Sequence, residues 1–403
     1  MPDDSGAALA TDMHARLATS HRRLAQYDAS LVDTQIAVTR IAAPTGDESE
    51  RGAYVARRFE SLGLIAVETD SAGNVIGRRP GKTTRPAVAV CAHLDTVFPR
   101  GTNLDVRREG ARLYGPGIND NGRGLAVMLA LAGEVDGDSL RTDRPIEFVA
   151  TTGEEGAGDL RGAKHYFATR GRDTAAAVIV DGAGDERIVH HALGSRRFRI
   201  AFDGPGGHSW AAFGVANAVH AAAAAATAIA SLTLPMEPRT TLTVARIGGG
   251  LSVNSIPADG WLEVDLRSSS TTVLDSVAKR IVAAVHEATS GENQRRTTGT
   301  AELKARVAVI GDRPCGDTAE DHPLVRAAVQ VTRLIGRAPE LAMASTDANV
   351  PISLGIPAIA IGAGGRGGDA HSAAEWYDNA GGPIGVGRVL TIIVSAAGLP
   401  GWA

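Results

Sequence analysis

The sequence predicts an α/β protein in which a mixed, mainly parallel sheet is covered by helices on both faces and is interrupted by an inserted ferredoxin-like α+β domain. Continuous apolar runs, such as 85–95 and 175–184, alternate with helical segments. Such runs are typical of strands buried on both faces of a parallel sheet. Near residue 193 the strands change to alternating polar and apolar residues, which is typical of half-exposed strands.

The first part of the chain, 1–192, is predicted to begin the α/β domain. Helical periodicity runs over 8–42, and a second helix over 49–63 follows a cap signal formed by Thr45, Asp47 and Glu48. The alternation of strands and helices then continues to the end of this part. Strands are predicted at 65–69, 74–78, 85–95, 145–152 and 175–184, and helices at 122–135 and 160–169.

The middle part, 193–312, has the order strand, helix, strand, strand, helix, strand, which is the split βαβ pattern of a ferredoxin-like domain. Its strands are predicted at 194–204, 240–249, 260–268 and 300–310, and its helices at 216–232 and 271–289. The α/β pattern returns in 313–403, with a helix at 322–336 and an apolar strand within 356–364. We therefore expect one domain to be inserted into the other.

The composition argues against several classes of protein. A net charge of −4 without a basic run gives no footprint for nucleic acid. The N-terminus lacks the pattern of a signal peptide, and the Ala-rich segment 216–232 contains His220 and small polar residues, so it is expected to be a packed helix and not a membrane span. Two cysteines, Cys91 and Cys315, are too few for a disulfide scaffold. We expect a cytoplasmic protein with neither nucleic acid nor membrane as a partner.

Polar residues follow the predicted strands at one edge of the sheet, where ligands bind in open α/β folds. Two histidines and several carboxylates suit a divalent metal, most often zinc, and two metals need one bridging carboxylate. The residues are His93, Asp95, Asp120, Glu154, Glu155, Asp181 and His371. The loop 114–124 does not match the G-x-G-x-x-G pattern, so a dinucleotide site is not predicted.

The adjacent glutamates have different predicted roles, because neighbouring side chains of extended backbone point in different directions. Glu155 is predicted to bind metal, while Glu154 faces the substrate and its water. A carboxylate there can take a proton from the water and pass it to a leaving amine, which is amide hydrolysis.

The motifs of the chain resemble those of the M20 metallopeptidases, a dinuclear-zinc family that includes glutamate carboxypeptidase, peptidase T and aminoacylase-1. They are collinear over about 85–380 and their combination is specific. The motifs are "HLDTV" (93–97), "YGPGINDNGRG" (114–124), "GEEGAG" (153–158), "VDG" (180–182), "GGHSW" (206–210), "SVNSIPA" (252–258), "EVDLRS" (263–268) and "GDAHSAAE" (368–375).

The resemblance implies two Zn²⁺ ions, with Co²⁺ or Mn²⁺ as alternatives. It implies that His93 and Asp181 bind one metal, that Glu155 and His371 bind the other, and that Asp120 bridges them. Asp95 is then expected to orient the imidazole of His93 through its second nitrogen. Glu154 is the implied general base.

The resemblance also implies that the inserted domain is a lid and a homodimer contact. His208 is expected to reach the site of a neighbouring subunit and to stabilise an oxyanion there. Asn254 and Arg267 are expected to contact the substrate, although Arg267 could instead form a surface ion pair. Arg366 could hold a substrate carboxylate or be a solvated loop charge, and Asp347 could recognise a substrate amine or be a turn residue.

Several functions stay open at this point. The leading hypothesis is hydrolysis of a peptide or N-acyl-amino-acid amide bond, by an amino-, di- or tripeptidase, a carboxypeptidase or an aminoacylase. An N-carbamoyl-amino-acid hydrolase and a non-catalytic metal-binding protein of the same fold are the alternatives. The Lys that much of the family has two residues after the bridging Asp is absent, and Arg123 stands one position later. This departure weakens assignment to the carboxypeptidase branch and leaves the metal ligands intact.

Overall fold

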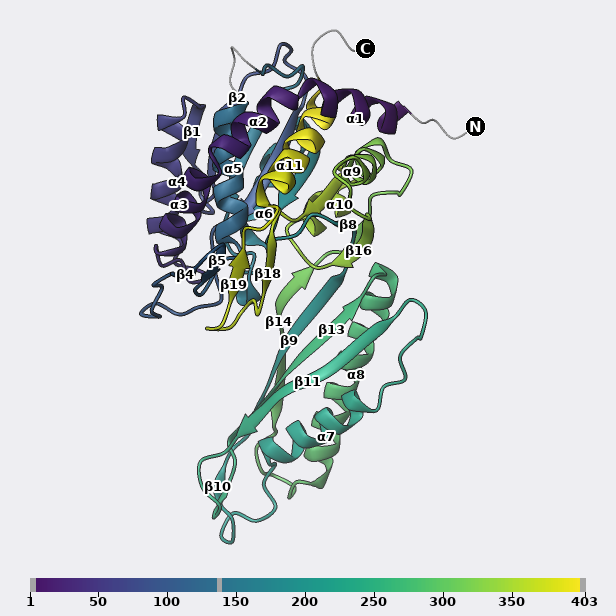
Figure 1. Ribbon diagram of the computed structural model, residues 1–403. Coiled ribbons are helices and arrows are strands. Elements are labelled where there is room, and N and C mark those ends of the chain that lie inside the picture. The colour runs from purple at the N-terminus through teal and green to yellow at the C-terminus, as the bar shows by residue number, and fades with distance from the viewer. Residues whose placement is uncertain (1–4, 136–139, 399–403) are drawn as a thin grey trace. The chain divides into compact units, whose positions relative to one another are not determined.

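The computed structural model describes residues 5–135 and 140–398 (Figure 1). The chain divides into two compact units, with boundaries after Ala192 and after Gly316. The second unit is one continuous segment, Leu193–Gly316, and the first unit is made from the chain on either side of it.

The described residues of the first unit form a mixed sheet with the strand order β1-β2-β6-β3-β7-β17-β8-β15, and β16 pairs with β8. Strands β3, β6 and β7 run parallel to one another, as do β7 and β17, whereas β1 and β2 are antiparallel. The strands are β1 Ile65–Thr69, β2 Val75–Arg79, β3 Ala87–His93, β6 Ile146–Thr151, β7 Thr174–Val180, β8 Arg187–Ala192, β15 Gly316–Asp317, β16 Glu340–Ala344 and β17 Ala358–Ile361. The predicted fold class is confirmed.

The central strand β3 explains why its sequence is apolar throughout. Val88 and Val90 belong to the core cluster on one face of the sheet, and Ala89 and Cys91 belong to the cluster on the other face. All of these side chains are fully buried. Successive side chains of a strand point to opposite faces, so a strand that is covered on both faces needs apolar residues at every position.

Helices cover the two faces of the sheet (Figure 1). Apolar residues of one set of helices join the first core cluster, and those of α6 and α10 join the second. The first set is α1 Ser5–Arg16, α2 Ala18–Gln26, α3 Asp28–Thr39, α4 Ser49–Ser61, α5 Gly122–Glu134, α9 Pro323–Leu334 and α11 Gly382–Ala397, and the second is α6 Arg161–Arg170 and α10 Asn349–Ser353. Among the described helices, none has the length and apolarity that crossing a membrane requires.

The N-terminal helical segment differs from its prediction. The periodicity over 8–42 predicts one helix, but the structure has three, separated at Leu17 and Tyr27. Each of the three packs against a different helix of the same unit: α1 against α9, α2 against α11 and α3 against α5. A straight helix could not reach all three partners, so the chain turns between them.

The second unit is an antiparallel sheet with the order β11-β13-β9-β14, packed against α7 and α8. The strand alternation follows the prediction: Leu262, Val264 and Leu266 of β13 are buried in the core of this unit. The elements are β9 Gly194–Asp203, α7 Ala218–Ala230, β11 Thr240–Gly249, β13 Asp259–Ser268, α8 Thr271–Arg295 and β14 Lys304–Arg313. The ferredoxin-like pattern is confirmed.

Two small sheets were not predicted, because their strands are too short to show a periodic pattern. One joins β10 and β12 in the second unit, and the other has the order β18-β19-β5-β4 in the first. Their strands are β10 Gly207–His208, β12 Ser255–Ile256, β4 Arg107–Glu109, β5 Arg112–Tyr114, β18 Arg366–Gly368 and β19 Trp376–Asp378. The pairing of β5 with β19 ties the chain before Asp120 to the chain after His371. Two short 3₁₀ turns, η1 Gly156–Gly158 and η2 Gly171–Asp173, complete the first unit.

Candidate metal centre and active site

Three neighbouring parallel strands bring polar residues to one edge of the first unit's sheet. His93 is the last residue of β3, Asp181 directly follows β7, and Glu154 and Glu155 follow β6. Since β6, β3 and β7 are adjacent and parallel, the residues after them meet at the same edge. The loop before α5 adds Asp120 to this edge.

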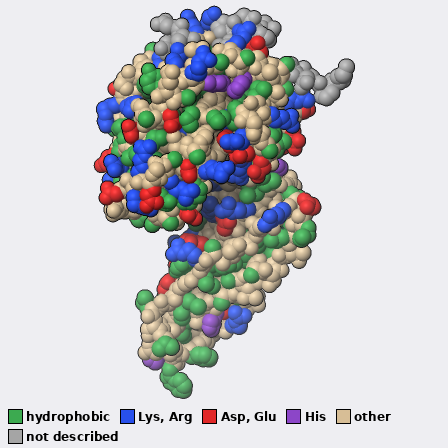
Figure 2. Space-filling view, viewed as in Figure 1, with side chains coloured by type: hydrophobic (Ala, Val, Ile, Leu, Met, Phe, Trp, Pro, Cys, Tyr) green, Lys and Arg blue, Asp and Glu red, His purple; other side chains and the backbone are tan. Residues whose placement is uncertain are grey.

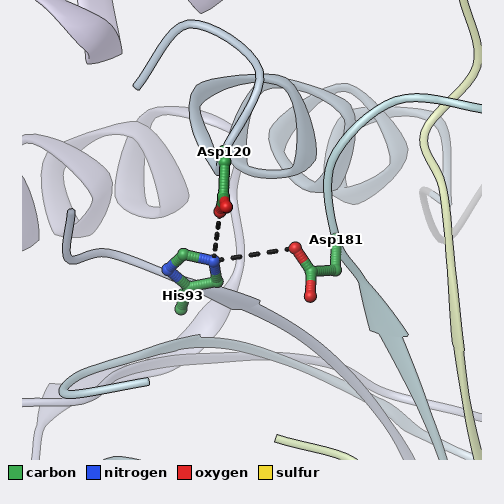
Figure 3. Close-up of side chains that lie close together, drawn as sticks. All are labelled: His93, Asp120 and Asp181. Atoms are coloured by element: carbon green, nitrogen blue, oxygen red, sulfur yellow. Dashed lines mark ion pairs between the residues drawn. The ribbon is translucent and has the colours of Figure 1, made fainter. Parts of the chain in front are cut away.

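One nitrogen of the His93 imidazole faces two carboxylates, those of Asp120 and Asp181 (Figure 3). Its Nε2 is 3.0 Å from Oδ1 of Asp120 and 3.7 Å from Oδ1 of Asp181. His93 is only 2% exposed, so Nε2 faces these two carboxylates and not water.

The second imidazole, His371, has an equivalent pair of neighbours. Its Nε2 is 3.2 Å from Oδ2 of Asp120 and 2.8 Å from Oε1 of Glu155. Asp120 therefore contacts both imidazoles, one with each carboxylate oxygen, and each imidazole has a further carboxylate of its own. Ligand atoms of His93, Glu154 and Glu155 also lie within 4.8 Å of one another.

The charges of these residues shift their pKa values together. The contact with Asp120, helped by Glu155 and opposed by burial, raises the pKa of His371 to about 9. Burial by itself would lower the pKa of His93, but the surrounding carboxylates of Asp120, Asp181 and Asp95 raise it well above its ordinary value. Burial would raise the pKa of Asp120, and the two imidazoles outweigh this and lower it. Both shifts favour the positively charged imidazoles, whose charge balances the carboxylates.

The donor set fits a pair of divalent cations. Four carboxylates and two imidazoles supply only oxygen and nitrogen atoms, which are the ligands of zinc and of other first-row metals. Oδ1 of Asp120 is buried and accepts no hydrogen bond from a described residue, although Nε2 of His93 lies nearby. A buried carboxylate oxygen needs a cation beside it, a place that the protonated imidazole of His93 holds here and that a metal ion could take over. The residues therefore fit metal ligands on both sides of Asp120.

Asp95 contacts both the imidazole of His93 and the loop of the two glutamates. Nδ1 of His93 is 3.0 Å from the backbone oxygen of Asp95 and 3.7 Å from its carboxylate. The carboxylate instead accepts the amide N–H groups of Glu154 and Glu155, each at 2.9 Å, and the hydroxyl of Thr45 at 2.8 Å. Burial would raise the pKa of Asp95, but His93 and these amides outweigh it and lower the pKa to about 2. The backbone of Asp95 orients the imidazole, and its side chain holds the loop of the two glutamates.

Glu375 holds the loop that carries Asp120. Its carboxylate accepts the amide N–H groups of Gly117, Asn119 and Asp120, all at 2.8 Å. Burial, opposed by these three amides, raises the pKa of Glu375 to about 7. Glu375 belongs to the motif "GDAHSAAE", but no role was predicted for it. Its place four positions after His371 in that motif was the available signal.

Asn121 links the same loop to β7. Its side chain caps α5 by accepting the amide of Gly124 at 3.0 Å, and it also accepts the amide of Gly182 at 3.1 Å. Its amide group donates to the backbone oxygen of Val180 at 2.9 Å. One buried side chain therefore fixes the neighbours of both Asp120 and Asp181, and the sequence analysis did not identify it.

Arg123, the residue that departs from the family pattern, contacts the backbone of Ala363 and the ring of Tyr377. It is fully buried, donates from Nε to the backbone oxygen of Ala363 at 2.9 Å, and lies 4.8 Å from the centre of the Tyr377 ring. Burial lowers its pKa. Arg123 thus supports the chain that leads to β18.

His208 and Asn254 lie together in the second unit. His208 of β10 is paired with Ser255 of β12, and the amide of Ser209 donates to the backbone oxygen of Asn254 at 3.0 Å. Nδ1 of His208 accepts the amide of Trp210 at 3.2 Å, so a neutral ring carries its proton on Nε2. His208 is exposed, and this nitrogen can donate a hydrogen bond to an outside partner.

The remaining predicted residues have the following surroundings. Arg267 of β13 donates from Nε to Asp265 at 2.7 Å, which is the surface ion pair considered as its alternative role. Arg366 of β18 is exposed, and its side chain makes no hydrogen bond or ion pair with another described residue. Asp347 is 1% exposed and accepts the hydroxyl of Thr151 at 2.5 Å, so a substrate amine does not reach it in this structure. Burial raises the pKa of Asp347 to about 6.

Comparison with known proteins identifies the family. A profile of peptidase family M20/M25/M40 matches residues 89–394, which is most of the chain. The chain belongs to peptidase family M20/M25/M40. The matched region contains every predicted metal ligand, and the M20 resemblance is confirmed.

Curated relatives of this M20 protein include carboxypeptidases. Carboxypeptidase G2 from a Pseudomonas species is 26% identical over 341 residues, which cover 78% of this chain and 77% of that protein. A putative [LysW]-lysine/[LysW]-ornithine hydrolase from Thermococcus kodakarensis is 32% identical over 133 residues, which cover 33% of this chain and 34% of that protein.

Solved structures share the M20 fold. A tripeptidase from Staphylococcus aureus has a TM-score of 0.74 and 22% identity, covering 91% of this chain and 98% of its own. The aminopeptidase PepT from Bacillus cereus has a TM-score of 0.72 with the same identity and coverage. A dinuclear metal-binding M20 peptidase from Bacillus subtilis has a TM-score of 0.66 and 15% identity, covering 92% of this chain and 99% of its own.

Proposed function

We propose that this M20 protein is a dinuclear, zinc-dependent hydrolase that cleaves an amide bond in a small peptide or an N-acyl amino acid. The observation that supports this most directly is Asp120, which contacts His93 with one carboxylate oxygen and His371 with the other. A bridging carboxylate with one imidazole and one further carboxylate on each side is the ligand set of a two-metal site. Asp181 completes one side and Glu155 the other. Co²⁺ or Mn²⁺ could take the place of zinc.

The reaction follows from the side chains around this site. Bound metal ions would polarise the scissile carbonyl and lower the pKa of a water molecule. Glu154 is the general base: its carboxylate takes a proton from the attacking water and gives it to the leaving amine. The backbone amides of Glu154 and Glu155 donate to the carboxylate of Asp95. The backbone from which the Glu154 side chain extends is therefore fixed. Nε2 of His208 donates to the oxygen that becomes negative as the carbonyl carbon turns tetrahedral.

The substrate is proposed to carry a free carboxylate. Carboxypeptidase G2, at 26% identity over 78% of this chain, supports this choice over a free amine, and the burial of Asp347 removes the acidic group that an amine would need. Arg267 is the proposed carboxylate ligand, because a guanidinium binds a carboxylate through two parallel hydrogen bonds. Binding would require Arg267 to leave Asp265. Asn254 supplies a further hydrogen bond, and the unpaired Arg366 is a second cationic candidate.

The first test compares wild type with Glu154→Gln after reconstitution with zinc or cobalt. We expect wild type to bind two metal equivalents and to cleave one class in a panel of dipeptides, tripeptides, N-acyl and N-carbamoyl amino acids. Glu154→Gln should keep both metals and lose about 10²–10⁴-fold in kcat. The neighbouring Glu155→Gln is the matched control, because it should lose metal as well as activity. Wild type that binds no metal, or Glu154→Gln at full activity, would contradict the proposal.

We also propose a homodimer formed through the second unit, in which His208 acts on the partner's substrate. Two inactive variants test this, Glu154→Gln and His208→Ala, mixed after subunit exchange. A mixed dimer contains one site with both Glu154 and His208, so random exchange should restore about a quarter of wild-type activity. Activity that stays at the level of the separate variants, or a monomer with full activity in gel filtration, would show that His208 does not act across subunits.

A further inference from the structure

The loop that carries Glu154 is held by an unbroken series of hydrogen bonds to its backbone. Four successive amide N–H groups, those of residues 152–155, each donate to a side-chain oxygen from elsewhere in the first unit. Thr152 donates to Asn74 at 3.0 Å, Gly153 donates to Glu48 at 3.2 Å, and the next two amides donate to Asp95. The loop leaves β6 before these residues, so no neighbouring strand supplies acceptors for them.

Glu48 is the member of this series that lies furthest away in the sequence, and it lies outside the region that the family profile matches. Its Oε1 accepts the amides of Gly46 at 2.9 Å and of Gly153 at 3.2 Å. Its Oε2 accepts from Nη2 of Arg161 at 2.6 Å. Glu48 is 4% exposed, so its charge is balanced by Arg161 and these amides more than by water.

The carboxylate of Glu48 was predicted to belong to a helix cap, and the structure gives it a different task. Glu48 is the N-cap residue of α4, but its side chain makes no capping hydrogen bond to that helix. It turns instead to Gly153, the residue directly before Glu154. Gly153 has φ +65°, and a side chain there would lie 2.5 Å from Nη1 of Arg161. The backbone conformation and the lack of space favour glycine at position 153. Gly153 is therefore held through its backbone, and Glu48 provides the acceptor for its amide.

We infer that Glu48 is a positioning residue for the general base, which it sets in place by accepting the amide of Gly153. This inference rests on the proposed role of Glu154. Asp95 fixes the two glutamates from one side of the loop, and Glu48 fixes the residue before them. Without Glu48 the buried amide of Gly153 loses its acceptor, and the start of the loop is free to shift. A displacement of about 1 Å at a reacting group can reduce the rate about 100-fold.

The test compares three variants at neighbouring positions. Glu48→Ala removes the acceptor, and Glu48→Gln keeps a neutral oxygen that can accept the amides of Gly46 and Gly153. Asp47→Ala is the matched control, because Asp47 is the adjacent acidic residue, is half exposed and pairs with Arg100 on the surface. We expect kcat to fall about 10- to 100-fold in Glu48→Ala with KM within about twofold of wild type. The kcat of Glu48→Gln should stay within about threefold of wild type, and the kcat of Asp47→Ala should match that of wild type.

A second measurement does not depend on catalysis. Amide hydrogen exchange over residues 152–158 should be faster in Glu48→Ala than in wild type, and unchanged in Asp47→Ala. Glu48→Asp, whose carboxylate is one methylene shorter, should show the same exchange and kcat changes if Glu48→Ala does not fold. Each of three results would overturn the inference. The first is unchanged amide exchange in both Glu48→Ala and Glu48→Asp. The others are equal kcat losses in Glu48→Ala and Asp47→Ala, and a kcat loss in Glu48→Gln as large as in Glu48→Ala. If wild type cleaves no substrate, the proposed function fails, while the exchange data still decide whether Glu48 holds the loop.

Discussion

At the scale of single residues, an imidazole that is proposed to bind a metal is protonated when the metal is absent. The pKa of His371 is raised to about 9 by Asp120 and Glu155, so the metal-free imidazole is protonated at pH 7. A histidine must be neutral to bind a metal. Metal binding and proton binding therefore compete for the same nitrogen of His371.

This competition predicts a pH dependence with a definite sign. The protonated fraction of His371 falls as the pH rises from 7 through about 9, so the apparent affinity for the metal should rise over that range and then level off. Calorimetric titration of zinc at pH 7 in buffers of different ionisation enthalpy should show about one proton released at this site. His371→Ala should reduce the release by about that amount. Metal affinity that is flat between pH 7 and 9 would contradict the prediction.

Residue chemistry also decided which parts of the site could be predicted. The cluster of imidazoles and carboxylates could be predicted because His and acidic residues directly after buried strands are uncommon, and adjacent parallel strands bring such residues to one edge of the sheet. The roles of Asp95 and Glu48 could not, because both act on backbone amides of a distant loop, and no sequence pattern records such a contact. For Asp347 two roles were open, an amine ligand or a turn residue, and its burial against Thr151 favours the structural role.

At the scale of elements, the cap of α5 joins helix, strand and site. The side chain of Asn121 makes hydrogen bonds to Gly124, Gly182 and Val180, and it is fully buried. Asn217, the cap of α7 in the second unit, accepts the amides of Val219 and His220 at 2.9 and 3.1 Å. The two caps have the same residue type in different units, so they form a natural pair for comparison.

Replacing these caps should therefore have different effects. Asn121→Ala should destabilise the first unit by about 2–4 kcal/mol, because it removes a cap and leaves buried partners unpaired, and it should weaken metal retention. Asn217→Ala should lower the stability of the second unit by about 1 kcal/mol and leave metal content unchanged. Denaturant unfolding and metal analysis of both variants check this. Equal metal loss in the two variants would show that α5 does not organise the site through its cap.

The elements themselves were predicted unevenly. Strands β3, β6 and β7 could be predicted because burial on both faces leaves an apolar run, as in 85–95. The hairpin of β18 and β19 could not, since three-residue strands in a glycine-rich segment have no periodicity. Its pairing with β5 still matters for function, because it places the chain of His371 beside the loop of Asp120.

At the scale of the whole molecule, the two units have separate cores. Among the described residues, the core cluster of the second unit contains only residues between Phe198 and Cys315, and the other clusters contain none of these. Each unit also has its own sheet. The second unit leaves and re-enters the first through β8 and β15, which are neighbours in the sheet. The amide of Thr318 donates to the backbone oxygen of His190 at 2.9 Å across this junction.

This arrangement predicts that the second unit can be removed. A chain in which a short Gly/Ser linker replaces Leu193–Gly316 should fold, because the ends to be joined already lie on adjacent strands. It should bind two metals and have no hydrolase activity, because His208, Asn254 and Arg267 are gone. Circular dichroism, metal analysis and the substrate panel test this against full-length His208→Ala. An excised chain that stays unfolded would show that the two units are not divided in this way, and one that retains activity would show that hydrolysis does not need His208, Asn254 and Arg267.

The same junction sets an order for folding during synthesis. Strand β17 lies between β7 and β8 in the sheet, and α9 and α11 belong to the first core cluster, yet all three are made after residue 317. When the ribosome has finished β8, the first unit therefore lacks a central strand and part of its cover, and its apolar edges are open. The second unit is one continuous segment and needs nothing that comes later. It can complete its fold while the first unit is still incomplete, so the unit made from the middle of the chain is the first to be finished.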